Sequence, residues 1–133
     1  MTDKPLISVI TPTYNRAHVL GRAIRSLQRQ TLDNYEHVIV DDGSTDDTRD
    51  IVAAFGDQRI RYLALRDRRG ANTARNAGLD MARAPLVTFL DSDDEFRSHR
   101  LQSTVELFAR HPEIGLLSTS FITEKGGVAL KSV

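Results

Sequence analysis

The chain has 133 residues, enough for one domain that buries its own core. Its 18 basic residues balance its 18 acidic residues, so no net charge points to nucleic acid or to an anionic membrane as a partner. The sequence has no cysteine, which excludes disulfides and thiolate metal sites, and we expect a cytoplasmic location. No signal-peptide pattern opens the sequence, and no apolar run reaches membrane-spanning length.

Strand and helix patterns alternate along the chain from its beginning. Strands are predicted over residues 6–11, 35–40, 60–65, 86–90 and 114–123, with a return strand from 128 to 130. Helices are predicted over residues 17–30, after Ser44, over 71–82 and after Ser98. Asn15 and Ser98 are candidate N-caps, and Ser44 with Asp47 resembles a capping box. The alternation predicts an α/β fold with a mainly parallel sheet flanked by helices and the start of a C-terminal hairpin.

Four polar loops follow the predicted parallel strands. Because right-handed crossovers bring the carboxyl ends of parallel strands to one edge, these loops should converge on one crevice. The loops are Thr11 to Arg16, Asp41-Asp42, Arg66 to Gly70, and Asp91 to Asp94. We expect the arginines Arg66, Arg68 and Arg69 to form a solvated loop face.

The run from Leu86 to Asp94 passes from five apolar or β-prone residues directly into three carboxylates. Its apolar part predicts a strand buried on both faces. Asp91 and Asp93 are two residues apart, so a turn can aim both at one Mg²⁺ or Mn²⁺ ion, which would also hold phosphates. Alternatively, the triplet is a solvated acidic loop that caps the next helix.

Three common α/β sites lack their signatures here. The turn after the first strand has no glycine, which argues against a dinucleotide site, and no P-loop motif is present. The acidic pairs follow the second and fourth strands, whereas in a receiver domain they would follow the first. A mononucleotide whose diphosphate is bridged by a metal remains.

Individual residues suit such a ligand, and each has a structural alternative. Tyr14 can stack on a base or serve as a packing residue, and Asp41 can accept from a base N–H or form a turn. Asp91 can accept from ribose hydroxyls, and Asp93 can hold the metal. Arg75 can pair with the diphosphate or the acidic triplet, or be an ordinary surface arginine.

Together these motifs resemble the family 2 glycosyltransferases of GT-A fold. The stretches concerned are Ser8 to Arg16, Val40 to Asp46, Ala74 to Gly78 and Phe89 to Asp94. The resemblance implies transfer of a sugar from a nucleotide-diphosphate donor, with a UDP-sugar favoured, usually with inversion. It implies that Asp91-Ser92-Asp93 is the Asp-x-Asp motif, with Asp93 the main ligand of Mn²⁺ or Mg²⁺. It also implies that Pro12, Tyr14 and Asp41 surround the base.

The sequence departs from the family in two respects. Ser98 stands where the family often has proline, and members carry an acceptor-binding half with a catalytic carboxylate after the hairpin. We therefore expect residues 1–133 to be the nucleotide-sugar-binding domain, with the catalytic base beyond Val133. Apolar surface around Leu116, Phe121 and Val128 would then favour self-association as a homo-oligomer.

The sequence leaves two main function classes open. The first is a metal-dependent glycosyltransferase with an unknown acceptor, and the second is a nucleotide-binding module without turnover. A receiver-like signalling domain is a third class. The candidate metal ligands are Asp93 and Asp91. The candidate substrate-binding residues are Thr11, Pro12, Tyr14, Arg16, Asp41, Asp42, Arg75, Asp91 and Ser92.

Overall fold

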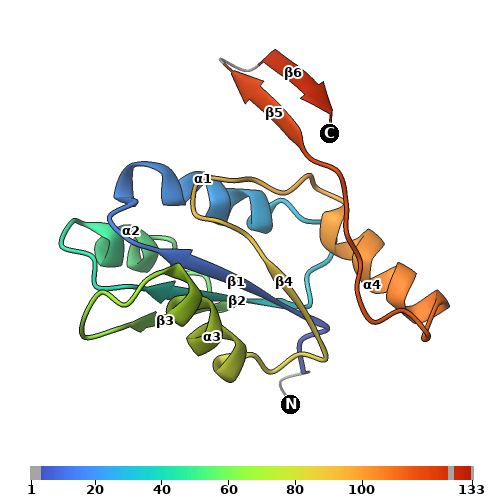
Figure 1. The fold of residues 1–133 in the computed structure, drawn as a ribbon, viewed down its shortest axis with the longest axis horizontal. Coiled ribbons are helices and arrows are strands. Elements are labelled where there is room, and N and C mark those ends of the chain that lie inside the picture. The colour runs from blue at the N-terminus through green and yellow to red at the C-terminus, as the bar shows by residue number, and fades with distance from the viewer. Residues whose placement is uncertain (1–3, 126–127, 133) are drawn as a thin grey trace.

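A four-stranded parallel sheet forms the centre of the protein (Figure 1). The computed structural model describes residues 4–125 and 128–132. In spatial order the strands are β3 (Ile60–Ala64), β2 (Tyr35–Asp41), β1 (Ile7–Thr13) and β4 (Leu86–Phe89). The expected α/β fold with a mainly parallel sheet is confirmed, and each predicted strand through residue 90 is present within two residues of its expected limits.

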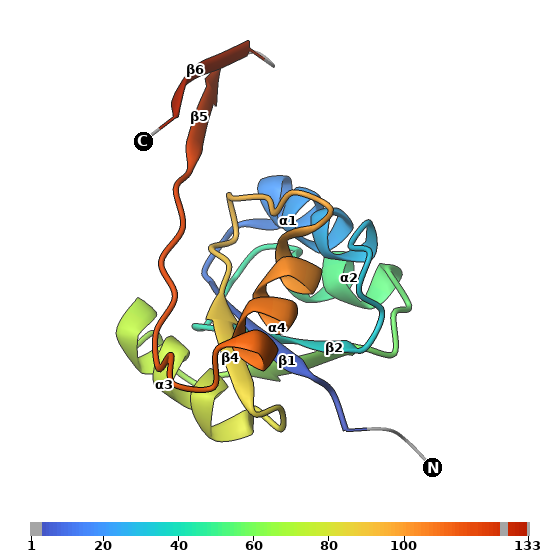
Figure 2. The same ribbon diagram turned by 90° about the vertical axis from the view of Figure 1, so that its right-hand side faces the viewer.

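Helices cover both faces of this sheet (Figures 1 and 2). Those on one face are α1 (Ala17–Gln28), α2 (Thr48–Ala54) and α4 (Arg100–Arg110), and α3 (Ala71–Met81) lies on the other. The two-residue period of the strands explains this division. Val9 of β1 packs with Ala23 of α1, whereas its neighbour Ile10 packs with Ala74 of α3.

The small residues of α3 bring this helix close to the sheet, as the sequence predicts. A Cβ atom on Gly78 would overlap the Cγ2 atom of Ile10, so no larger residue fits there without a shift. Ala74, one turn earlier, is fully buried. The N-terminus of α3 is thereby held beside the carboxyl ends of β1 and β2.

Strand β4 lies at the edge of the sheet, which corrects one expectation. We expected its apolar run to be buried on both faces, but Val87 is 39% and Phe89 is 43% exposed. The reason is its position: β1 is its partner on one side, and α3 packs over β1 and β2 instead of β4. The central strands β1 and β2 are buried along their whole length.

The predicted N-caps are wrong in detail. The N-cap positions are occupied by Arg16, Asp47 and His99, and none of these side chains makes a capping hydrogen bond. The predicted caps Asn15, Ser44 and Ser98 lie before these positions. The Ser98 carbonyl accepts a hydrogen bond from the Thr31 amide instead. Asn15 and Ser44 bond to each other's loops, because the ends of neighbouring parallel strands bring them together.

The segment after α4 also differs from the expected fifth strand. Residues 114–121 form no regular structure, and the strand β5 covers only Ile122–Lys125, paired antiparallel with β6 (Val128–Ser132). Within the described ranges no strand lies beside 114–121, and an extended segment needs such a partner to form a ladder. The predicted return strand is confirmed, and the hairpin projects away from the sheet (Figure 2). The predicted turn residues Gly126 and Gly127 lie outside the described residues.

The expected apolar exposure of this segment is confirmed where side chains are described. Leu116 is 87% and Phe121 is 61% exposed. The side chain of Val128, the third residue of that expectation, lies outside the described part. No helix among the described residues is long and apolar enough to cross a membrane.

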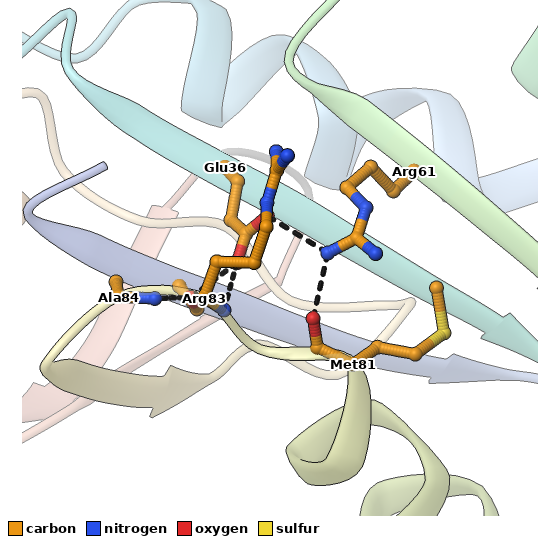
Figure 3. A network of polar contacts seen from close by, with 6 residues as sticks. Glu36, Arg61, Met81, Arg83 and Ala84 are labelled. Atoms are coloured by element: carbon orange, nitrogen blue, oxygen red, sulfur yellow. Dashed lines mark hydrogen bonds and ion pairs between the residues drawn. The ribbon is translucent and has the colours of Figure 1, made fainter. Parts of the chain in front are cut away.

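A buried ion-pair network closes the amino edge of the sheet (Figure 3). Glu36 of β2 is 2% exposed and accepts hydrogen bonds from the Ser8 hydroxyl at 2.6 Å and the Arg83 amide at 2.6 Å. It also pairs with the guanidinium groups of Arg83 and Arg61 at 3.0 and 3.1 Å. Arg61 donates in addition to the carbonyl of Met81, so the network ties the end of α3 and the start of β4 to the sheet.

Candidate nucleotide-binding site

A cleft of about 340 Å³ opens at the carboxyl edge of the sheet. It lies where β1 is flanked by β2 on one side and β4 on the other, the switch point at which open α/β sheets bind ligands. Its lining residues are Pro12, Thr13, Tyr14, Arg16, Asp42, Arg68, Gly70, Ala71, Arg75, Asp91, Ser92 and Asp93. The predicted convergence of four loops on one crevice is therefore confirmed.

Most of the candidate site residues line this cleft, and two do not. Those present are Pro12, Tyr14, Arg16, Asp42, Arg75, Asp91, Ser92 and Asp93. Thr11 is fully buried beneath the cleft, and its hydroxyl pairs with Nε2 of His37 at 2.8 Å. Asp41 is likewise buried, 3% exposed, and is not among the lining residues.

The Asp41 carboxylate holds the turn after β2. Its Oδ1 atom accepts a hydrogen bond from the Ser44 amide at 2.8 Å, and its Oδ2 atom accepts one from the Tyr62 hydroxyl. Burial, together with this bond to Asp41, raises the pKa of Tyr62. This geometry supports the turn-forming alternative for Asp41, and it leaves Asp42 as the β2 carboxylate that faces the cleft.

Asp42 organises the loop before α3. Its two carboxylate oxygens accept hydrogen bonds from the backbone amides of Arg69 at 2.6 Å and Gly70 at 2.8 Å. Gly70 adopts a φ of 97°, a left-handed conformation that glycine tolerates without strain. Arg66, Arg68 and Arg69 are exposed, as expected for a solvated loop face, and the bonds to Asp42 also fix their loop against the cleft.

Arg68 is a cleft residue that the sequence analysis missed. Its guanidinium lies over the ring of Tyr14, 4.0 Å from the centroid, a distance typical of a cation–π contact. Thr13, Gly70 and Ala71 were also missed. For Arg68 and Gly70 a signal was present, because their loop follows a parallel strand and precedes a helix, the arrangement that places a loop at the ligand edge.

The acidic end of β4 forms the opposite wall of the cleft. The backbone turns tightly there, with the Asp94 amide donating to the Asp91 carbonyl at 3.1 Å. Asp91 pairs with Arg75 of α3 at 3.1 Å, one of the two partners expected for this arginine, although half of the Asp91 side chain stays exposed. Burial and the nearby charges of Asp93 and Asp91 raise the pKa of Asp94.

This wall suits a divalent cation that is shared with a ligand. Asp91 and Asp93 offer hard carboxylate oxygens to the cleft, whereas no group of three or more acidic, His or Cys residues able to hold a metal occurs in the described ranges. Mg²⁺ and Mn²⁺ accept few protein ligands when phosphate oxygens and water supply the rest. The donor set therefore fits a metal held jointly by the protein and a diphosphate.

Comparison with known proteins agrees with this geometry. The family model described as "Glycosyl transferase family 2" matches residues 8–130. The Escherichia coli UDP-Glc:alpha-D-GlcNAc-diphosphoundecaprenol beta-1,3-glucosyltransferase WfgD is 37% identical over 109 residues, which are 82% of this chain and 43% of that protein. The chain spans less than half the length of the curated relatives it matches.

Two solved structures with the same fold contain nucleotides. Residues 1–349 of S. aureus TarS, crystallised with UDP, superpose with a TM-score of 0.77 at 32% identity, over 80% of this chain and 32% of that one. The mannosyltransferase PcManGT from Pyrobaculum calidifontis, in complex with GDP-Man and Mn²⁺, gives a TM-score of 0.72 at 30% identity, over 81% and 33%. Sequence, fold and motif order agree, and the chain belongs to glycosyltransferase family 2.

Proposed function

We propose that the cleft binds a nucleoside-diphosphate sugar and that the protein acts in metal-dependent, inverting glycosyl transfer. The observation that carries this proposal is the pairing of two chemically different walls across one cleft. Tyr14 and Asp42 offer an aromatic face and a carboxylate, as a nucleobase requires. Asp91, Asp93 and Arg75 offer two carboxylates and a guanidinium, as a metal-bound diphosphate requires.

The nucleobase would lie beside the β1 and β2 loops. Pro12 and Tyr14 provide apolar contact, and Asp42 is placed to accept from a base N–H. Asp41 would not contact the base, because it does not line the cleft and its own oxygens bind the Ser44 amide and the Tyr62 hydroxyl. The UDP in TarS supports a uridine donor as the first choice to test, and the GDP-Man in PcManGT makes guanosine the second.

The diphosphate would lie against the β4 and α3 wall. Asp93, with Asp91, would hold Mn²⁺ or Mg²⁺, which supplies positive charge to the departing diphosphate. Arg75 and Arg16 line the same cleft and can neutralise phosphate oxygens. Arg75 already pairs with Asp91, so binding of a diphosphate would exchange one anionic partner of this arginine for another. The Mn²⁺ in PcManGT supports the metal assignment.

Inverting transfer needs a base that deprotonates the acceptor hydroxyl on the face opposite the diphosphate. We assign the carboxylates of this cleft to the donor, and Asp42 and Asp91 are already bonded to Arg69, Gly70 and Arg75. Glu113 lies between α4 and the unstructured segment. We propose that residues 1–133 are the donor-binding part of the enzyme and that the base lies beyond Val133, with Glu124 as the alternative.

Calorimetric titration of the chain with UDP, GDP, UDP-glucose, UDP-GlcNAc and GDP-mannose, with and without MnCl₂, tests the proposal. We expect Mn²⁺-dependent binding of at least one nucleotide. The absence of binding to all five would overturn the proposal. Release of free sugar or its transfer to an added acceptor separates an enzyme from a nucleotide-binding module without turnover. Full turnover by these 133 residues would contradict the placement of the base, and Glu124 would then be the residue to replace.

A further inference from the structure

We infer that Asn15 is a positioning residue for the nucleobase side of the cleft. This inference rests on the proposed function and deepens it. Asn15 does not line the cleft, but both of its sequence neighbours, Tyr14 and Arg16, do. Its side chain points instead to the loop after β2, which supplies Asp42 to the same cleft.

Hydrogen bonds join the two loops through Asn15. Its Oδ1 atom accepts from the backbone amides of Thr45 at 2.8 Å and Asp46 at 3.3 Å. Its own amide donates to the Ser44 hydroxyl at 2.8 Å. The clamp defined by Asn15, Ser44, Thr45 and Asp46 therefore continues the pairing of β1 with β2 beyond the last ladder residues, Thr13 and Asp41.

The clamp also fixes where two helices begin. The Asp46 carboxylate accepts from the amide of Ala17, the first residue of α1, at 3.1 Å. Its other oxygen accepts from the amide and hydroxyl of Thr48, the first residue of α2. Tyr14 and Arg16 lie between Thr13, the last residue of β1, and Ala17, which Asp46 holds. Little conformational freedom therefore remains for their backbone.

The backbone conformation at Asn15 explains why asparagine suits this position. Its φ is 50°, and it is the one non-glycine residue with positive φ among the described residues. Asparagine tolerates this left-handed conformation better than most residues. Glycine would tolerate it too but would lose the Oδ1 acceptor, and aspartate would keep both properties. The position thus allows the acceptor to be removed without straining the backbone.

These properties define a matched set of variants. In Asn15→Gly the dissociation constant for UDP with Mn²⁺ should rise about tenfold, whereas Asn15→Asp should stay within about threefold of the unsubstituted chain. Asp57→Ala is the control for stability. The Asp57 carboxylate accepts hydrogen bonds from the amide and side chain of Arg59 and from the side chain of Gln28, about as many as the clamp contains. Asp57 precedes β3 and therefore lies at the amino edge of the sheet, opposite the cleft. The substitution Asp57→Ala should lower the melting temperature without changing the affinity for UDP.

Amide hydrogen exchange of the ligand-free chain gives a second readout. Asn15→Gly should speed exchange at Thr45 and Asp46, whose amides lose their acceptor. Unchanged UDP affinity in Asn15→Gly, or equal weakening in Asp57→Ala, would overturn the inference. If the unsubstituted chain binds none of the five nucleotides, the proposed function fails separately, and unchanged exchange in Asn15→Gly would then overturn the clamp itself.

Discussion

Glu36 at the amino edge of the sheet and the acids at its carboxyl edge place the same functional group in opposite situations. Glu36 is 2% exposed, and four donor groups from Ser8, Arg61 and Arg83 saturate its oxygens. Asp91 is half exposed and has one arginine partner, while Asp93 stands exposed at the cleft. The hydrogen bonds of Glu36 all come from within the protein, whereas Asp91 and Asp93 have carboxylate oxygens that can bind a ligand.

The pKa values of the two regions differ in the corresponding way. Burial alone would raise the pKa of Glu36, but the hydrogen bonds from Ser8, Arg83 and Arg61 outweigh it and lower the pKa. At the carboxyl edge, burial and two neighbouring acids raise the pKa of Asp94. Two arginines balance the charge of Glu36, whereas at the carboxyl edge Arg75 pairs with Asp91 and, among the described residues, no ion pair reaches Asp93 or Asp94. This difference predicts which substitutions affect folding and which affect binding.

Replacing Glu36 should have the largest effect on stability. Glu36→Ala leaves the Ser8 hydroxyl and the Arg83 amide without an acceptor, and breaking such a buried network costs about 3–5 kcal/mol of the free energy of unfolding. Urea denaturation followed by circular dichroism measures it. The control Glu106→Ala removes an exposed pair with Arg110 and should cost less than about 0.5 kcal/mol. A loss for Glu36→Ala as small as that of the control would contradict a structural role.

Replacing Asp93 should instead abolish Mn²⁺-dependent UDP binding while leaving stability within about 0.5 kcal/mol. The side chain is exposed at the cleft, and its removal also relieves repulsion with Asp94. Calorimetry with and without MnCl₂ is the measurement, and Asp80→Ala, an exposed acid of α3 outside the cleft lining, is the control. Undiminished metal-dependent affinity in Asp93→Ala would remove Asp93 from the metal site.

The two acids at the end of β2 should differ in their effect on binding, because Asp42 lines the cleft and Asp41 does not. Asp41→Asn should lower the free energy of unfolding by about 1–3 kcal/mol, because a buried carboxylate loses one of its charged hydrogen bonds. Asp42→Asn should weaken UDP binding and also lower the free energy of unfolding, because Asp42 is 3% exposed and its two oxygens accept hydrogen bonds from the amides of Arg69 and Gly70. The sequence alone led us to expect that Asp41→Ala weakens binding with little loss of stability. Strong loss of affinity without loss of stability in Asp41→Asn would restore that first expectation.

The sequence predicted the central part of this fold better than its edges. Strands β1 and β2 are buried along their whole length because helices cover both their faces, and the polar residues that follow them lie at the ligand edge by topology. The edge position of β4 depends on which strands pair in the sheet. The apolar sequence of β4 itself does not indicate whether a strand pairs on one side or on both. The same holds for residues 114–121, whose apolar character indicated a strand although no partner lies beside them in the described ranges.

Site residues divide in the same way. Asp91 and Asp93 were predicted to face the cleft because they follow a strand directly, and they do so. The sequence did not predict that Asp42 lines the cleft while Asp41 turns to Ser44, since adjacent residues at the end of a strand point in different directions. The contact between Arg68 and Tyr14 joins loops far apart in the chain, and no local pattern encodes it.

The smallest expected effect concerns His37, the neighbour of Glu36 in β2, which is buried without charge. Burial lowers the pKa of His37 from 6.5 to about 3, partly offset by the charge of Asp57. The unfolded chain therefore binds a proton below pH 6.5 that the folded chain does not, so the stability from neutral His37 is complete above pH 6.5 and is lost as the pH falls. The loss should approach about 1.4 kcal/mol per pH unit, and above about pH 5 it precedes most carboxylate titration.

His37→Gln should flatten this pH dependence, since glutamine keeps a polar partner for the Thr11 hydroxyl but does not titrate. The free energy of unfolding from urea curves between about pH 5 and 7 gives the slope for each variant. The exposed His18→Gln should keep the slope of the unsubstituted chain. Equal slopes in all three proteins would show that His37 takes up its proton over the same pH range in the folded and unfolded states, and Glu36 would then lie beside a second buried charge in β2 at low pH.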